Sequence, residues 1–194
     1  MKELLFATHN ANKAKEISRM LDGKTSVLTL DDAGVMVDIP ETANTIEGNA
    51  LIKAHFLHEL TGKACFADDT GLEVAALGGD PGVFTARYAG DECDPERNMA
   101  KLLAALSGVA DREASFRTVI AYVDQLGRET VFEGVCPGRI ALAKHGTGGF
   151  GYDPVFEPMG FGGASFAEMS LDDKNKVSHR GKAVRQLVNF LSKL

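Results

Sequence analysis

Short apolar runs alternate with segments of helical periodicity along most of the chain, and this alternation limits the possible folds more than any other feature. Residues 2–7 are predicted to form a strand, and apolar side chains then recur at helical spacing from Ala14 until Gly23, where the helix is expected to end. Further helices are predicted over 47–60 and 94–106 and after Gly181, and further strands over 64–67, 115–124, 129–135 and 140–143. Helices and strands interleave without a strict βαβ rhythm, which indicates an α/β protein with a mixed β-sheet flanked by helices.

The length and the apolar content indicate one folded domain. The 194 residues are 44% hydrophobic, enough to bury a sizeable core, and no repeat or flexible linker divides them. We therefore expect a single domain over residues 1–194. Charged residues interrupt every apolar run well before the roughly 18 residues that a membrane helix needs, and the first residues lack the apolar stretch of a signal peptide. No membrane partner is expected.

The charge balance and the cysteines narrow the function classes. The chain has 21 basic and 27 acidic residues, a net charge of −6, which disfavours nucleic acid as a partner because long polyanions are held mainly by Lys and Arg. A small phosphate ligand needs only a few local donors and is not excluded. Cys65, Cys93 and Cys136 are odd in number and lack C-x-x-C spacing, so we expect reduced thiols in a cytoplasmic protein.

A polar stretch follows the first predicted strand and leads into the first predicted helix. It consists of Thr8, His9, Asn10, Ala11, Asn12 and Lys13. The free N–H groups and the positive dipole end of a helix favour phosphate, and Lys13 adds a full positive charge. The alternative is an N-capping loop with Asn12 as the cap, and the residues alone favour neither. The pattern G-x-x-x-x-G-K-[ST] of P-loop NTPases is absent.

Two adjacent carboxylates, Asp68 and Asp69, follow the apolar run at 64–67. Paired carboxylates repel each other unless they are solvated or hold a cation, and Mg²⁺ prefers a few carboxylates together with water and substrate phosphates. A Mg²⁺ site is therefore one interpretation, in which Glu41 or Glu47 can share the metal. The alternative is an Asp-rich turn into Thr70 with no ligand.

A glycine-rich segment at 146–151 formally matches G-x-G-x-x-G, the pattern of dinucleotide-binding folds. That interpretation requires a helix directly afterwards, whereas Pro154 follows two residues behind Tyr152 and breaks any helix. We reject it. A flexible loop that carries Phe150, Tyr152 and Asp153 can instead enclose a flat base, and the alternative is a tight connection between strands.

Cations, hydroxyl groups and an imidazole gather shortly before the last predicted helix. The members of this grouping are Lys174, Lys176, Ser178, His179, Arg180 and Gly181. Within an acidic protein such a grouping is a candidate anion site. The alternative is a solvated charged loop, which is more frequent for a run of this kind.

Taken together and in this order, the motifs resemble those of the inosine triphosphate pyrophosphatase family. The matching segments extend from Ala7 to Ala183 and are ATHNANKAKEI, ETANTIEGNALIKA, FADDTGLEV, PGVFTARYAG, GTGGFGYDPVF and SHRGKA. The resemblance implies Mg²⁺-dependent hydrolysis of ITP, dITP and XTP to the nucleoside monophosphate and pyrophosphate, which removes deaminated purine nucleotides from the pool. It also implies a homodimer and an elongated fold of two lobes with a central nucleotide cleft.

The resemblance also assigns roles by position. Asp69 would be the catalytic carboxylate and a metal ligand together with Glu41. The substrate would be bound by Thr8, His9, Asn10, Ala11, Asn12, Lys13, Thr70, Phe150, Gly151, Tyr152, Asp153, Lys174, His179 and Arg180. Some relatives carry a second acid next to Glu41, where this chain has Pro40, so the second metal carboxylate stays open. Two other functions also stay open, namely a less selective nucleotide or phosphate-ester hydrolase and a nucleotide-sensing module without turnover.

Overall fold

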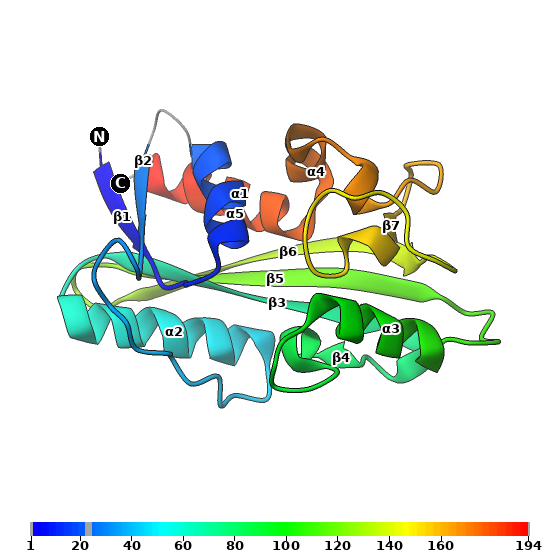
Figure 1. Ribbon diagram of the computed structural model, residues 1–194. Helices are drawn as coiled ribbons and strands as arrows, with labels where there is room; N and C mark the ends of the chain where they lie inside the picture. Colours follow the sequence, from blue (N-terminus) through cyan, green and yellow to red (C-terminus); the bar gives the residue numbers. More distant parts are fainter. Residues whose placement is uncertain (1, 22–24, 194) are drawn as a thin grey trace. The chain divides into compact units, whose positions relative to one another are not determined.

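The computed structural model, drawn in Figure 1, describes residues 2–21 and 25–193. These residues fall into two compact units. The first unit comprises the described residues up to Asp69, Thr118–Gly134 and the described residues from Arg180 onward. The second unit comprises Thr70–Arg117 and Val135–His179. Each unit is described by itself below.

The strands form a mixed sheet, as the sequence predicts. In chain order they are β1 (Lys2–Phe6), β2 (Thr25–Thr29), β3 (Cys65–Val74), β4 (Pro81–Gly82), β5 (Glu113–Val123), β6 (Glu129–Ile140) and β7 (Phe156–Pro158). Their order is β2-β1-β3-β5-β6-β7, with β4 paired to β3. β1 is parallel to β2 and β3, whereas β4 and β7 are antiparallel to their neighbours. The helices are α1 (Ala11–Leu21), α2 (Ile46–Thr61), α3 (Pro95–Ala105), α4 (Leu171–Val177) and α5 (His179–Leu191).

Helices cover both faces of the strands in the first unit. In Figure 1, α2 lies against one face, and α1 and α5 lie against the other. The rings of Phe6 on β1 and Phe66 on β3 stack with centroids 4.4 Å apart. Both belong to a core that α1 and α5 complete with Ile17, Leu21, Val184 and Leu187. This packing holds β3 against α1 immediately before Asp68 and Asp69.

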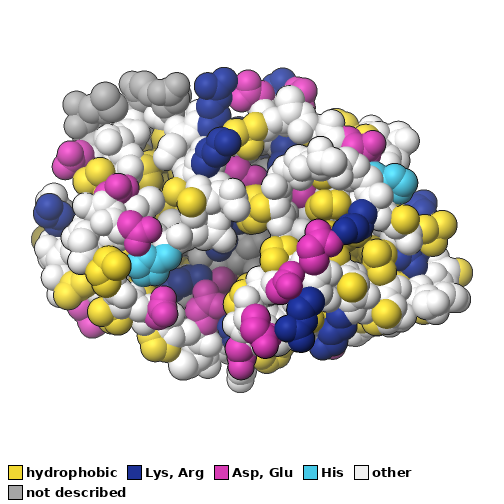
Figure 2. Space-filling view, in the orientation of Figure 1, with side chains coloured by type: hydrophobic (Ala, Val, Ile, Leu, Met, Phe, Trp, Pro, Cys, Tyr) yellow, Lys and Arg dark blue, Asp and Glu magenta, His cyan; other side chains and the backbone are white. Residues whose placement is uncertain are grey.

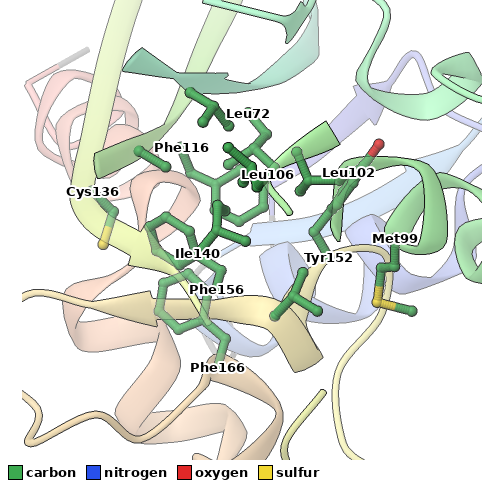
Figure 3. Packing of buried hydrophobic residues seen from close by; sticks show 13 residues of the cluster. Leu72, Met99, Leu102, Leu106, Phe116, Cys136, Ile140, Tyr152, Phe156 and Phe166 are labelled. Atoms are coloured by element: carbon green, nitrogen blue, oxygen red, sulfur yellow. The ribbon is translucent and has the colours of Figure 1, made fainter. Parts of the chain in front are cut away.

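The second unit has its own apolar core, shown in Figure 3. Phe116 on β5 lies edge-on to Phe156 on β7 with centroids 4.7 Å apart, and Phe166 packs on both. α3 contributes Met99 and Leu102 to the same core. Phe156 and Phe166, which follow the glycine-rich loop in the chain, thus belong to a buried aromatic cluster.

Several predicted element boundaries are wrong. α5 begins at His179 rather than after Gly181, and it is preceded by the unpredicted short helix α4, which contains Lys174. Ser178 lies between the two helices with extended backbone angles, φ −66° and ψ 158°, and so separates them. The predicted strand over 140–143 does not form, because its first residue, Ile140, ends β6. β2 was not predicted, and the predicted helix end at Gly23 lies outside the described residues.

The surface charges, the helix lengths and the thiols add three further observations. On the face drawn in Figure 2, acidic and basic side chains are interspersed, and neither sign gathers into one broad area. Within residues 2–21 and 25–193, no helix combines the length and the apolar character required to cross a membrane. All three cysteines are free thiols, and burial raises the pKa of Cys65 to about 12.

Truncating the stacked ring of β3 tests the role of this packing. Phe66 is fully buried, so Phe66→Ala is expected to lower the free energy of unfolding by about 3–5 kcal/mol, measured by chemical denaturation. Phe161, which is 41% exposed, serves as the control, and Phe161→Ala is expected to change stability by less than about 0.5 kcal/mol. Equal losses for the two variants would contradict the assignment of Phe66 to the core.

Candidate active site

The polar stretch between β1 and α1 is organised by its own side chains. Asn10 Oδ1 accepts hydrogen bonds from the backbone N–H groups of Asn12, at 3.0 Å, and Lys13, at 3.1 Å. Asn10 Oδ1 thus caps the helix, and the prediction of Asn12 as the cap is wrong because α1 already begins at Ala11. The backbone N–H of Asn10 in turn donates to Thr8 Oγ1 at 3.1 Å. The stretch is therefore a preformed turn at a helix N-terminus, where the dipole favours anions.

His9 ties this turn to the segment that follows β2. Its Nδ1 lies 2.7 Å from Asp31 Oδ1 and its Nε2 lies 3.3 Å from the carbonyl oxygen of Val37. Both partners are acceptors, so both ring nitrogens donate only when the imidazole is protonated. The hydrogen bond to Asp31 raises the pKa of His9 above its ordinary value, although partial burial opposes the shift. A raised pKa favours the protonated form of His9, which is the form that donates to both partners.

Asp68 is buried between two cations. Its Oδ1 accepts from Lys13 Nζ at 2.9 Å, and its Oδ2 accepts from Arg180 Nε at 3.1 Å. Arg180 also donates through Nη1 to Glu16 on α1 at 2.5 Å. Burial alone would raise the pKa of Asp68, but Lys13 and Arg180 outweigh it and hold that pKa far below its usual range. Burial also lowers the pKa of Lys13, against the attraction of Asp68.

Asp69 belongs to a second charged group, in which Lys53 of α2 is the centre. Lys53 Nζ donates to Asp69 Oδ1 at 2.9 Å and to Glu41 Oε1 at 2.7 Å. Burial raises the pKa of Asp69, and Lys53 only partly offsets this rise. For Lys53 the balance is reversed, because burial lowers its pKa but the two carboxylates raise it by more.

The two aspartates point to opposite faces of the sheet. They lie within β3, and successive side chains of a strand alternate between faces. Asp68 accordingly meets residues of α1 and α5, whereas Asp69 meets Lys53 of α2 on the other face. The prediction of a strand end or turn at these residues is wrong, because nearby cations compensate both charges and allow the strand to continue. The two carboxylates therefore do not surround one cation.

Two acidic residues of the first unit fit a magnesium site in which the substrate supplies part of the coordination shell. No group of three or more His, Cys, Asp and Glu side chains arranged to hold a metal is found in residues 2–21 and 25–193. Mg²⁺ in nucleotide enzymes, however, commonly takes one or two carboxylates and completes its shell with water and substrate phosphates. Glu41 and Asp69 share Lys53 as a partner and are therefore candidates for such a pair. Glu47 is exposed in the first turn of α2.

The second unit holds a separate group around Asp153. Asp153 Oδ2 accepts from Lys174 Nζ at 2.6 Å and from the backbone N–H of Phe150 at 2.8 Å. The Lys174 ammonium also lies 4.9 Å from the centroid of the Phe150 ring. A Cβ at Gly149 would lie 2.0 Å from Asp153 Oδ2, so glycine is required for the loop to close on this carboxylate. Gly151 extends the same loop with a positive φ of 61°.

Other predicted residues of the second unit take different positions. Tyr152 is buried in the apolar core, where its hydroxyl donates to the carbonyl oxygen of Thr85 at 2.9 Å and burial raises its pKa. His179 is also buried, and its ring stacks on Phe116 with centroids 4.5 Å apart. Lys176 is exposed and pairs with Asp173. Thr70 is the first residue of the second unit, directly after Asp69.

Sequence reasoning missed Lys53 and Glu16. The signal for Lys53 was present, because Ala50, Ala54 and Leu57 mark the buried face of α2 and Lys53 falls inside that stripe. A lysine within a buried helical stripe requires a partner of opposite charge. Glu16 precedes the buried Ile17 in α1 and gave no comparable signal.

Comparisons with known proteins agree in family and fold. The sequence model of the Ham1 family matches residues 4–190. The chain is 54% identical over 192 residues to the dITP/XTP pyrophosphatase of Porphyromonas gingivalis and 49% identical over 190 residues to that of Flavobacterium johnsoniae, with 98% of each chain covered in both cases. Among solved structures, the Ham1 protein of Staphylococcus aureus matches with TM-score 0.89 and 36% identity over 99% of both chains. The HAM1 protein of Coxiella burnetii matches with TM-score 0.89 and 37% identity over 100% of both.

The tie between His9 and Asp31 predicts a titration that can be observed directly. NMR of the His9 ring protons is expected to give a midpoint above 6.5, and Asp31→Asn is expected to lower it. Because the pKa is raised in the folded state, the stabilisation from this contact is complete below pH about 6.5 and is lost as the pH rises through the folded-state value. Asp91→Asn, at an exposed aspartate of the second unit, is the control and should leave the midpoint unchanged. An Asp31→Asn midpoint equal to that of the unaltered protein would show that the contact is not formed in solution.

Proposed function

The chain belongs to the Ham1 family, and on this premise we propose that it hydrolyses dITP, XTP and ITP to the nucleoside monophosphate and pyrophosphate. Such an activity would remove deaminated purine nucleotides from the nucleotide pool. The observation that carries the proposal is the group in which Lys53 joins Asp69 and Glu41, in the same unit as the helix N-terminus that bears Lys13. The resemblance of the sequence to the inosine triphosphate pyrophosphatases supports the further proposal of a cytoplasmic homodimer.

The first unit is proposed to bind the triphosphate. The turn from Thr8 to Lys13 presents a helix N-terminus, and the ammonium of Lys13 supplies a full positive charge to phosphate oxygens. Asp68 holds that ammonium in place through its 2.9 Å contact. When bound by Glu41 and Asp69, Mg²⁺ would neutralise charge on the phosphates.

Asp69 is proposed as the general base. Its carboxylate takes a proton from a water molecule, whose oxygen forms a bond to the α-phosphorus while the bond from that phosphorus to the bridging oxygen breaks. Pyrophosphate leaves with the bonding electrons, and Lys13 stabilises the charge that develops on it. Burial raises the pKa of Asp69 above its ordinary value, which brings this carboxylate closer to the basicity that suits proton transfer near neutral pH.

The second unit is proposed to select the base, and Arg180 of the first unit is proposed, separately, to take part in substrate binding. Phe150 offers an aromatic face, and Lys174 and His179 are buried donors. Hypoxanthine and xanthine carry a carbonyl where adenine carries an amino group, so a donor placed to hydrogen-bond this carbonyl finds no acceptor at the same position of adenine. Unpaired buried donors discriminate strongly between ligands. The proposed substrate-binding residues also include Gly151, Tyr152, Asp153 and Thr70. Tyr152 and Asp153 shape the loop through their own hydrogen bonds.

A product assay tests the activity. The protein is incubated with dITP, XTP and ATP in ¹⁸O-labelled water, with Mg²⁺ or with EDTA. We expect pyrophosphate from dITP and XTP, the label in the monophosphate, far lower efficiency with ATP, and no turnover in EDTA until Mg²⁺ is restored. Stepwise release of orthophosphate would indicate a general phosphohydrolase, and binding without turnover would indicate a sensor. Label in the pyrophosphate would place the attack at the β-phosphorus.

Removal of the proposed base tests the mechanism. Asp69→Asn is expected to lower kcat for dITP by at least about 100-fold, because general-base catalysis contributes roughly 10²–10⁴-fold. The fold should persist, since asparagine retains an oxygen that accepts from Lys53, and circular dichroism checks this. Asp91→Asn, the control at an exposed aspartate, should keep kcat within about twofold. Near-normal turnover of Asp69→Asn would exclude Asp69 as the base.

A further inference from the structure

The segment that carries Glu41 runs back along α2 and is held to it at successive positions. The backbone N–H of Gly48 donates to Thr45 Oγ1 at 3.0 Å, and the backbone N–H of Ala43 donates to Asn49 Oδ1 at 2.9 Å. Lys53 Nζ then reaches Glu41 Oε1 at 2.7 Å. The segment therefore runs antiparallel to the start of α2: positions 45, 43 and 41 of the segment contact positions 48, 49 and 53 of the helix, in that order.

The last two contacts lie close together both along the segment and along the helix. Asn49 and Lys53 are four residues apart, about 6 Å along a helix and on the same face. Glu41 and Ala43 are two residues apart and span at most about 7 Å of chain. Glu41 thus lies only two residues from the backbone anchor at Ala43, and this short connection limits where the carboxylate of Glu41 can lie.

The start of the segment is also packed tightly on the helix. A Cβ at Gly48 would lie 2.6 Å from the Cβ of Ala43 and 2.9 Å from Thr45 Oγ1. Glycine therefore allows the backbone at Ala43 to come close enough for the amide of Asn49 to reach it.

Asn49 is fully buried, and its amide serves only this contact among the described residues. The orientation of the amide is fixed because a backbone N–H requires an acceptor, which places Oδ1 toward Ala43. Nδ2 has no hydrogen-bond partner in the described part of the chain. A buried donor without a partner lowers stability, so stability alone does not account for an asparagine here.

We propose that Asn49 is a positioning residue for the hydrolysis: by holding Ala43 it places the Glu41 carboxylate against Lys53, the same ammonium that contacts Asp69. This inference rests on the proposed function, because it assigns Glu41 a part in that reaction. Asn49 itself need not touch the substrate. Its effect is transmitted through the short backbone between Ala43 and Glu41.

A double-mutant cycle separates this role from a structural one. Asn49→Leu keeps the approximate size but removes the acceptor, and it is expected to lower kcat for dITP by about 10- to 100-fold, as loss of a residue that orients a site carboxylate does. In a Glu41→Gln background the same change should lower kcat by less than about twofold, because the residue through which Asn49 acts is already disabled. Asn49→Asp, which retains the acceptor, should recover most of the loss. If the two substitutions lower kcat independently, so that the loss in the Asn49→Leu, Glu41→Gln double variant is the product of the single losses, the proposal is overturned.

Two further variants keep the proposal testable. If Asn49→Leu does not fold, Asn49→Ala takes its place in the cycle, since it removes the acceptor without adding volume. Thr45→Val removes only the acceptor for Gly48, so it is expected to lower the thermal midpoint and to leave kcat within about twofold. A loss of kcat in Thr45→Val as large as in Asn49→Leu would show that general loosening of the helix start is the cause, and would overturn the role of Asn49.

Amide exchange distinguishes failure of this inference from failure of the proposed function. In the absence of nucleotide, the Ala43 amide is expected to exchange slowly by NMR, to exchange at least about tenfold faster in Asn49→Leu, and to stay slow in Asn49→Asp. Fast exchange in the unaltered protein would overturn the positioning role even if the enzyme is active. Slow exchange in a protein that releases no pyrophosphate from dITP or XTP would instead overturn the proposed function and, with it, the catalytic part of this inference.

Discussion

Compensation of buried negative charge on β3 is the interaction on which the arrangement of the first unit depends. Asp68 and Asp69 are 1% and 6% exposed, and an uncompensated buried carboxylate costs several kcal/mol. The compensating cations come from three helices, as Lys13 of α1, Lys53 of α2 and Arg180 of α5. Each of these helices is therefore fixed to the strand by charge as well as by apolar packing, and the residues that hold the unit together are also the candidate site residues.

The alternation of side chains along β3 divides these charges into two groups with different chemistry. On the face of α1 and α5, Asp68 holds Lys13 and Arg180, and Glu16 also pairs with Arg180, so the feature of this face that favours anions is Lys13 at the N-terminus of α1. On the face of α2, a cation holds two carboxylates, which favours a site for a metal ion or a proton. An acidic protein with a net charge of −6 can in this way present positive charge to phosphate, because charge is balanced locally and not over the whole chain.

Helices and strands could be predicted from the sequence more reliably than the long-range contacts that assemble the site. The strand at 2–7, the helix at 47–60 and the mixed sheet follow from apolar periodicity, which depends on neighbouring residues. The contact between Asp68 and Arg180 joins residues 112 positions apart, and no local pattern encodes it. The alternative of a turn at Asp68 and Asp69 is wrong for the same reason, since the cations that allow a buried strand there lie far away in sequence. β2 and α4 are short, and their stability comes from tertiary packing more than from their own propensity.

The opposite pKa shifts of the adjacent aspartates argue for separate roles. Arg180 and Lys13 outweigh burial at Asp68 and hold its pKa low, so this carboxylate stays ionised and binds protons poorly. Burial prevails at Asp69, whose pKa is raised despite Lys53. Neighbouring titratable groups with diverging pKa values are how enzymes assign one group to electrostatics and the other to proton transfer. A change that moves Glu41 away from Lys53 would lower the pKa of Asp69, because the repulsion from Glu41 falls and Lys53 is left to Asp69, so the proposed anchor between Asn49 and Ala43 also bears on the basicity of Asp69.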